Sequence, residues 1–181
     1  MHFKPTGLPG VVLVEPEVFS DGRGFFYESY HQRHFEENHL PGVFRQDNHS
    51  LSRRGVIRGL HFQREPFAQG KLVQVVRGAV FDVAVDIRPQ SSVYRQWIGF
   101  KLDAENRSML FIPAGFAHGF CALENDTEVL YKATEVYSPA HERGIAWNDP
   151  DIGIAWPDLG ISYIVSEKDQ ALPRLKDLKE K

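Results

Sequence analysis

Hydrophobic and polar positions alternate along much of the middle of the chain. In the segment 79–87, AVFDVAVDI, Asp82 and Asp86 alternate with Val83 and Val85, and the segment 56–63, VIRGLHFQ, alternates in the same way. A period of two residues is typical of a strand with one buried face. Further strands are predicted at 11–14, 25–30, 71–76, 92–102, 108–112 and 127–137, and after the turn 113–120. Short strands at this spacing predict a mostly β sandwich or barrel rather than a parallel α/β fold.

Helix signals are few. Residues 31–38 predict a short helix that ends at Leu40-Pro41-Gly42. Residues 1–10 contain two prolines and two glycines and predict an irregular lead-in, and 44–52 is a short polar stretch. The chain becomes loop-like from Ser138, and its tail predicts a solvated helix. With no repeat or linker, we expect one domain: an N-terminal extension (about 1–50), a barrel core (about 51–137), and C-terminal loops with a helix (138–181).

Composition and charge narrow the class of protein. The chain has 181 residues, enough for one domain with a core, and 42% apolar content argues against disorder. A net charge of −3 gives no general attraction to nucleic acid or to an anionic membrane. The single cysteine, Cys121, excludes an intrachain disulfide and indicates a reducing cytoplasm. No apolar run approaches membrane-spanning length, and the N-terminus lacks the apolar core of a signal peptide.

The stretch 53–71, RRGVIRGLHFQREPFAQGK, combines a strand pattern with unusually many polar groups. Arg58, His61 and Gln63 are too polar for a dry core without partners. We therefore expect this strand to line a polar pocket in which His61 is the reactive group. Most of the eight histidines are expected to be structural or exposed, whereas His61 and His118 each lie on or beside a predicted strand, next to glycine and phenylalanine.

The residues around these two histidines resemble the motifs of cupin barrels. Residues 113–118, PAGFAH, match half of the second cupin motif, PxGxxHxxxN. The first motif is broken, because Gln63 stands where a second metal-binding histidine is expected. Borderline-soft metals prefer imidazole, thiolate or carboxylate ligands. We therefore expect a cupin-like jelly-roll barrel with a few short helices and no catalytic metal.

Several motifs occur together in one order along nearly the whole chain. They are GLHFQ at 59–63, PAGFAHGF at 113–120, Tyr131-Lys132, HERGI at 141–145 with WNDP at 147–150, and SEKD at 166–169. Together they resemble the dTDP-4-dehydrorhamnose 3,5-epimerases. The resemblance implies a cofactor-independent, homodimeric isomerase that epimerises dTDP-4-dehydro-6-deoxy-D-glucose at C3 and C5. The product, dTDP-4-dehydro-L-rhamnose, is a precursor of dTDP-L-rhamnose for lipopolysaccharide or other cell-surface polysaccharides.

The residue types suit this chemistry. A ketone at C4 acidifies the protons on both neighbouring carbons, so one base and one oxyanion site can serve both inversions. Inversion requires removing a proton from one face and returning one to the other, and hence two proton carriers. Histidine suits the base, tyrosine the acid, and a cation would stabilise the enolate.

The resemblance assigns these roles to individual positions. His61 matches the base and Asp169 the carboxylate that orients it. Tyr131 matches the acid on the other face, Lys71 the cation near the sugar carbonyl, and His118 a second sugar contact. Without the resemblance, Asp169 and Lys71 would be read as solvated, and Tyr131 and His118 as core residues.

The resemblance also implies a nucleotide site. Arginine forks suit phosphate oxygens, and an aromatic ring can stack on the base. Tyr137 matches the stacking residue, and Arg23, Phe26 and Glu28 are expected to reach the site of a neighbouring subunit. The other expected contacts are Gln46, Asp47, Asn48, Arg58, Glu142 and Lys168. The ordinary alternative for the charged ones is a surface salt bridge, which is common and weak.

Three alternatives remain open from the sequence. A related enzyme could invert only C3 or C5, or isomerise a related dTDP-4-keto sugar. A metal-dependent cupin enzyme is disfavoured by Gln63. A non-catalytic sugar-nucleotide binder would have no need for His61, Tyr131 and Asp169 together.

Overall fold

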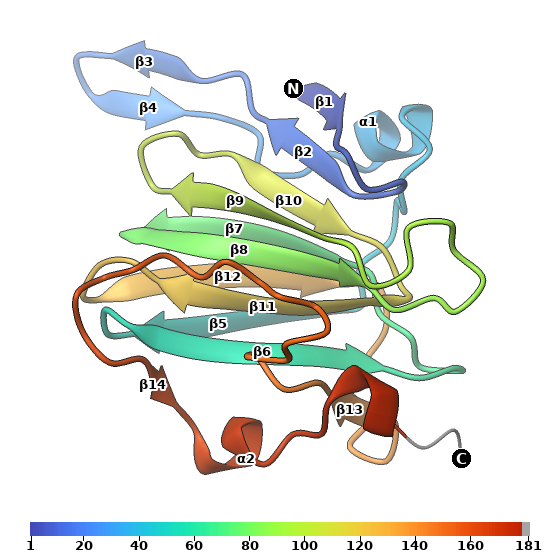
Figure 1. The fold of residues 1–181 in the computed structure, drawn as a ribbon. Coiled ribbons are helices and arrows are strands. Elements are labelled where there is room, and N and C mark those ends of the chain that lie inside the picture. Colours follow the sequence, from blue (N-terminus) through green and yellow to red (C-terminus); the bar gives the residue numbers. More distant parts are fainter. Residues whose placement is uncertain (179–181) are drawn as a thin grey trace.

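A computed structural model describes residues 1–178 as two antiparallel sheets packed face to face (Figure 1). The first sheet has the order β1 (His2–Pro5), β2 (Val12–Glu15), β10 (Met109–Ile112), β7 (Lys71–Arg77), β12 (Thr127–Ala133), β5 (Gln46–Ser52). The second has the order β13 (Glu142–Gly144), β6 (Val56–Gln63), β11 (Phe116–Ala122), β8 (Ala79–Asp86), β9 (Trp97–Asp103). The short strand β14 (Ile164–Val165) runs parallel to β6.

Most consecutive strands from β5 to β13 lie in opposite sheets, which makes the sandwich a jelly roll. Alternate side chains of both sheets point inward and form the main core, which includes Val73, Val75, Val80, Leu110 and Phe120. The prediction of a mostly β, cupin-like jelly roll from the alternating pattern is confirmed.

Both outer faces of the sandwich are covered as well, which explains why β8 is apolar on both sides. Helix α1 (Gln32–Glu37), at the predicted position, inserts Phe35 against Leu72 and Met109 on the outer face of the first sheet. The C-terminal segment crosses the outer face of the second sheet (Figure 1), where Ile145 and Leu175 pack against Leu60. This segment contains helix α2 (Glu167–Gln170) and a 3₁₀ turn, η1 (Leu175–Asp177).

Two local predictions were wrong, and a third segment forms a strand that the sequence had not indicated. Residues 1–10 are not all irregular, because β1 pairs with β2 at the sheet edge, where Pro5 is tolerated as the last residue. The predicted strand at 25–30 is only β4 (Gly24–Phe26), paired with β3 (Phe19–Asp21) in an isolated hairpin. The polar stretch 44–52 forms β5, so strands from the expected N-terminal extension belong to the first sheet.

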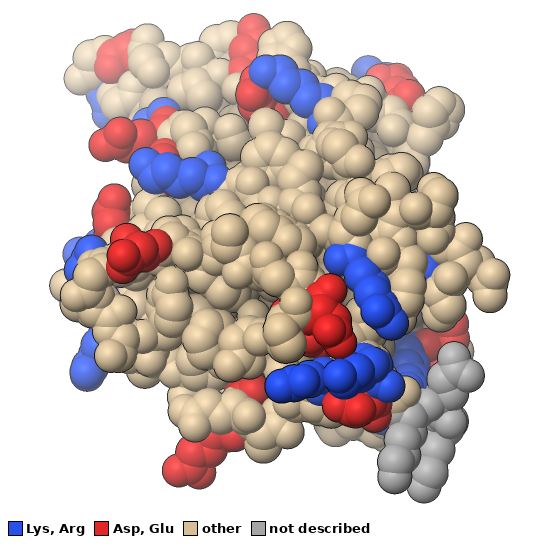
Figure 2. All heavy atoms as spheres, viewed as in Figure 1, with Lys and Arg blue, Asp and Glu red and all other residues tan. Residues whose placement is uncertain are grey.

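The face drawn in Figure 2 carries few charged side chains at its centre, and charges of both signs lie around its rim. This face therefore presents no large field of one sign. Within residues 1–178, no helix combines the length and apolar character needed to cross a membrane.

Candidate active site

The pairing of β6 with β11 brings two histidines together. His61 and His118 are direct cross-strand partners, so their side chains share one face of the second sheet. The register shifts between His118 and Phe120, opposite Gly59. Gly59 has φ +130°, and a Cβ there would lie 2.6 Å from the Cα of Gly119, so close contact of the two backbones requires glycine.

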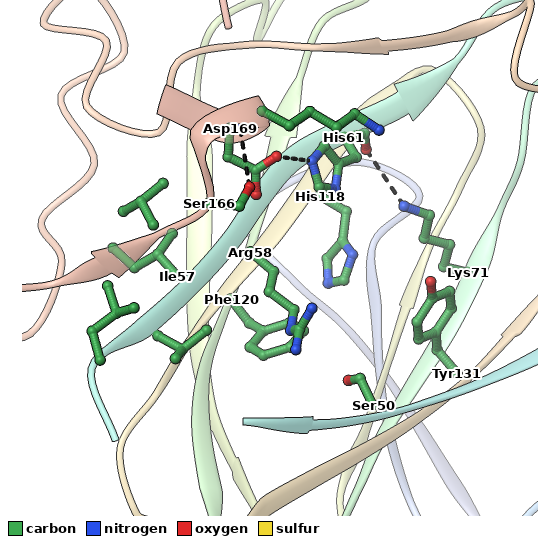
Figure 3. Close-up of a pocket in the computed structure, with 14 residues that line it drawn as sticks. Ser50, Ile57, Arg58, His61, Lys71, His118, Phe120, Tyr131, Ser166 and Asp169 are labelled. Atoms are coloured by element: carbon green, nitrogen blue, oxygen red, sulfur yellow. Dashed lines mark hydrogen bonds and ion pairs between the residues drawn. The ribbon is translucent and has the colours of Figure 1, made fainter. Parts of the chain in front are cut away.

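A cavity of about 510 Å³ opens between the two sheets at this point (Figure 3). The second sheet contributes Arg58, His61 and His118, and the first contributes Lys71, Tyr131 and Ser50. Strand β14 and helix α2 close one side. Arg58 and His61 share the cavity although they are three positions apart, because the irregularity at Gly59 breaks the strict alternation of β6.

His61 is bonded to a carboxylate from the far end of the chain. Its Nε2 lies 2.6 Å from Asp169 Oδ1, and the Gly59 N–H donates to Asp169 Oδ2 at 3.2 Å. Ser166 caps α2 by accepting from the Asp169 N–H at 3.1 Å, which fixes that residue in the first turn. Burial raises the pKa of Asp169, but the interactions with His61, Gly59 and Ser166 outweigh it and leave that pKa below its usual value. A carboxylate can only accept, so neutral His61 donates from Nε2 and keeps Nδ1 as the proton acceptor.

Lys71 and Tyr131 lie on the first sheet, on the neighbouring strands β7 and β12. The Lys71 ammonium donates to the His61 carbonyl at 3.4 Å and lies 5.9 Å from the centroid of the Tyr131 ring. Burial lowers the pKa of Lys71 to about 8, against the opposing charges of Asp82 and Glu142. Burial raises the pKa of Tyr131, so its phenol keeps its proton at neutral pH. In Figure 3 the two side chains stand together, apart from the His61–Asp169 pair.

A second histidine–aspartate pair lies deeper. His118 Nε2 is 2.8 Å from Asp82 Oδ1, and both side chains are buried. Burial, together with the charges of Lys71 and His61, lowers the pKa of His118 more than Asp82 raises it, so the imidazole is neutral at neutral pH. Asp82 Oδ2 has no hydrogen-bond partner within residues 1–178.

A second, smaller cavity of about 280 Å³ shares His61, Lys71 and Tyr131 with the first. Four residues expected to bind the nucleotide line it: Gln46, Asn48, Tyr137 and Glu142. Glu142 Oε2 accepts from both the Tyr137 hydroxyl and the Lys168 ammonium, each at 2.7 Å. Arg58 donates to Ser52 Oγ and to the Leu51 carbonyl, each at 3.1 Å.

Four of the expected contacts do not reach these cavities within the chain. Asp47 points to the outer face of the first sheet, where it pairs with Lys132 at 3.0 Å. Arg23 forms an ion pair with Asp21 at 2.5 Å in the β3–β4 hairpin. In the same hairpin the Phe26 ring is 67% exposed. Glu28 follows the hairpin, and its carboxylate lies 3.9 Å from His34 Nδ1.

Other residues of the site had weak signals or none in the sequence. Asp82 showed only as a polar position on a half-buried strand, because its partner depends on strand register. Ser50 lines the larger cavity, and its buried hydroxyl has no partner among the described residues. Within residues 1–178, no group of three or more His, Cys, Asp or Glu side chains could hold a metal ion.

Comparison with known proteins agrees with this geometry. The family model for dTDP-4-dehydrorhamnose 3,5-epimerase matches residues 5–177. The dTDP-4-dehydrorhamnose 3,5-epimerase of Pseudomonas aeruginosa is 56% identical over 165 residues, which are 90% of each chain. The crystal structure of dTDP-6-deoxy-D-glucose-3,5-epimerase from Legionella pneumophila, in complex with dTDP-4-keto-L-rhamnose, superposes with a TM-score of 0.93 at 43% identity, covering 98% of this chain and 94% of that one.

A more distant relative carries out a narrower reaction. A 3′-monoepimerase from Streptomyces bikiniensis, in complex with dTDP-quinovose, superposes with a TM-score of 0.91 at 34% identity, covering 96% of this chain and 87% of that one. The family match and the identities together show that the chain belongs to the dTDP-4-dehydrorhamnose 3,5-epimerase family.

Proposed function

We propose that this isomerase epimerises dTDP-4-dehydro-6-deoxy-D-glucose at C3 and C5 to dTDP-4-dehydro-L-rhamnose. The observation that carries the proposal is the convergence of the His61–Asp169 pair, Tyr131 and Lys71 on one cavity. Its volume of about 510 Å³ is within the range of small-molecule sites.

His61 acts as the base in this proposal. Its Nδ1 removes the proton from the carbon next to the ketone, and Asp169 stabilises the imidazolium that forms. Tyr131 then donates its phenolic proton to the opposite face of the enolate. The same two groups serve C3 and C5, because both carbons adjoin the C4 ketone. Between the two inversions His61 releases its proton to solvent and Tyr131 regains one from solvent.

Lys71 stabilises the negative charge that develops on O4. A preorganised cation in a site shielded from water is a strong stabiliser of an enolate. Because burial lowers its pKa to about 8, Lys71 is still mainly protonated at pH 7. The neutral His118 is a second contact to the sugar.

The nucleotide occupies the smaller cavity and reaches Arg58 and Lys168 in the larger one. Tyr137 stacks on the thymine, and Gln46, Asn48 and Glu142 supply polar contacts. Arg58 and Lys168 bind the diphosphate, which requires Lys168 to leave Glu142. No metal or other cofactor takes part in this proposal.

The proposed enzyme works as a cytoplasmic homodimer. The β3–β4 hairpin exposes three phenylalanine rings, Phe19, Phe25 and Phe26, which a partner subunit would cover. Arg23, Phe26 and Glu28 would then contribute to the site of the partner, which accounts for their position outside the cavities of their own chain.

Proton NMR in heavy water with dTDP-4-dehydro-6-deoxy-D-glucose tests the reaction. Deuterium should enter at both C3 and C5, and the product should have the L-rhamno configuration. Exchange at C3 alone would identify a monoepimerase, the reaction of the Streptomyces bikiniensis relative. No exchange at either carbon would refute the proposal.

A further inference from the structure

Gln63, the last residue of β6, is only 6% exposed, and both polar atoms of its side chain form hydrogen bonds. Its Nε2 donates to the carbonyls of Phe67 at 2.6 Å and Val136 at 3.1 Å. Its Oε1 accepts from the Ser138 N–H at 2.6 Å. One amide thus satisfies three backbone groups on two loops.

Two of these backbone groups flank Tyr137 on either side. A second glutamine, Gln46, accepts from the Tyr137 N–H itself at 2.6 Å. Tyr137 lies outside regular secondary structure, four residues beyond the end of β12 at Ala133, and its side chain is 49% exposed. The sheet ladder therefore does not fix the backbone at this point, and the two glutamine side chains take its place.

We propose that Gln63 is a positioning residue for Tyr137, and through Tyr137 for the nucleobase of the substrate. This inference rests on the proposed function, in which Tyr137 is the stacking platform. A ring that must meet a flat base loses affinity when its backbone shifts, because stacking depends on the angle and offset of the two rings.

The chemistry explains why an amide stands here. The site needs a donor for two carbonyls and an acceptor for one N–H, and a primary amide offers both on one planar group. A carboxylate would face the Phe67 and Val136 carbonyls with no proton to donate. Methionine would fill the space and satisfy none of the three groups.

A double-mutant cycle tests the inference. Gln63→Met should raise the KM for the dTDP-sugar, and the dissociation constant of dTDP, about tenfold, the scale of a lost base–aromatic stack. Because His61, Lys71 and Tyr131 are untouched, kcat should change by less than about threefold. In a Tyr137→Ala background, Gln63→Met should raise KM by less than about twofold, because the platform is already gone.

Thr127→Val is the matched control for loss of stability. The Thr127 hydroxyl is also buried and donates to backbone carbonyls, those of Ala79 and Glu124, but it lies at the other end of β12. Thr127→Val should lower the melting temperature without raising the KM for the dTDP-sugar. Gln63→Glu should resemble Gln63→Met, since it loses both donors.

Two different results would overturn the inference. Equal factors for Gln63→Met in the parent and in the Tyr137→Ala background would show that Gln63 acts independently of Tyr137. A fall in kcat at unchanged KM would place it in the chemical step instead. If Tyr137→Ala itself left KM unchanged, the stacking role in the proposed function would fail, which is a separate outcome from the failure of Gln63→Met alone.

Discussion

The two histidine–aspartate pairs of the site have similar hydrogen-bond geometry but differ in their exposure to solvent. Both use the imidazole Nε2, at 2.6 Å from Asp169 in one pair and 2.8 Å from Asp82 in the other. The side chains are 30% and 5% exposed in the His61–Asp169 pair, and 7% and 0% exposed in the His118–Asp82 pair. His61 and Asp169 both line the cavity, whereas His118 alone of the second pair does so and Asp82 lies behind it.

The difference in exposure indicates that the two pairs have different roles in the reaction. A base must gain a proton and carry a positive charge for part of the cycle, and the partly open pair can bear that charge beside its carboxylate. Protonation of His118 in the buried pair is unfavourable, because burial lowers its pKa and the nearby charges of Lys71 and His61 lower that pKa further. We therefore assign proton transfer to the open pair, and orientation and charge balance to the buried one.

The largest expected effect comes from removing the open histidine. His61→Asn should lower kcat about a thousandfold and stop deuterium entering at C3 and C5, because general-base catalysis contributes on that scale. His118→Asn should retain exchange and raise KM about tenfold. Steady-state kinetics and NMR in heavy water measure both.

The same two variants should have the opposite order of effects on stability: His118→Asn should destabilise the fold more than His61→Asn. His118→Asn leaves buried Asp82 without its partner and should destabilise the fold by about 1–3 kcal/mol, more than His61→Asn does. Urea unfolding measures this. If His61→Asn exchanged protons normally while His118→Asn did not, the assignment of the two pairs would be reversed.

The proton donor opposite the open pair should show the next largest effect. Tyr131→Phe removes the phenolic proton but keeps the ring, and it should slow inversion about a hundredfold, above all at C5, while His61 still removes protons. The matched measurement compares deuterium exchange with product configuration in the same sample. Parent-like turnover in this variant would mean that another group supplies the acid.

The sequence predicted the open pair and its surroundings better than the buried pair. The polar cluster on β6 identified His61 because a polar pocket interrupts a strand pattern. Asp169, 108 residues away, came only from the resemblance, since no local pattern links α2 to β6. Asp82 could not be assigned a partner, because strand register is a property of the assembled sheet.

Strand β5 shows why the hydrophobic pattern fails beside a site. Its inward positions are Gln46, Asn48, Ser50 and Ser52, and the first three face a polar cavity instead of the core. The alternation is present but both faces are largely polar, so residues 44–52 carried no strand signal. The shared direction of Arg58 and His61 likewise depends on the irregularity at Gly59, which a strict period of two does not predict.

Replacing the aspartate of each pair should also distinguish the roles of the two pairs, with smaller losses of activity than replacing His61. Asp169→Asn leaves His61 without the charge that stabilises its protonated form and should lower kcat on the order of a hundredfold. Asp82→Asn should cost about tenfold, because His118 does not change its charge during turnover. Rate constants for exchange at saturating substrate measure both, and equal losses would remove the distinction between a proton-transferring and an orienting pair.

The smallest and most specific effect concerns the alkaline limb of the pH profile. In the proposed mechanism Lys71 stabilises the enolate only while protonated, and burial lowers the pKa of Lys71 in the free enzyme to about 8. The value of kcat/KM should therefore fall as pH rises through 8 and be about tenfold lower one unit above it. The charge of Asp82 raises the pKa of Lys71, and Asp169 is not among the groups that shift it. Asp82→Asn should therefore move the limb to lower pH, whereas Asp169→Asn, the slower enzyme, should leave it in place. A limb that moved in Asp169→Asn and stayed in Asp82→Asn would show that the open pair, not the buried one, sets the charge of the lysine.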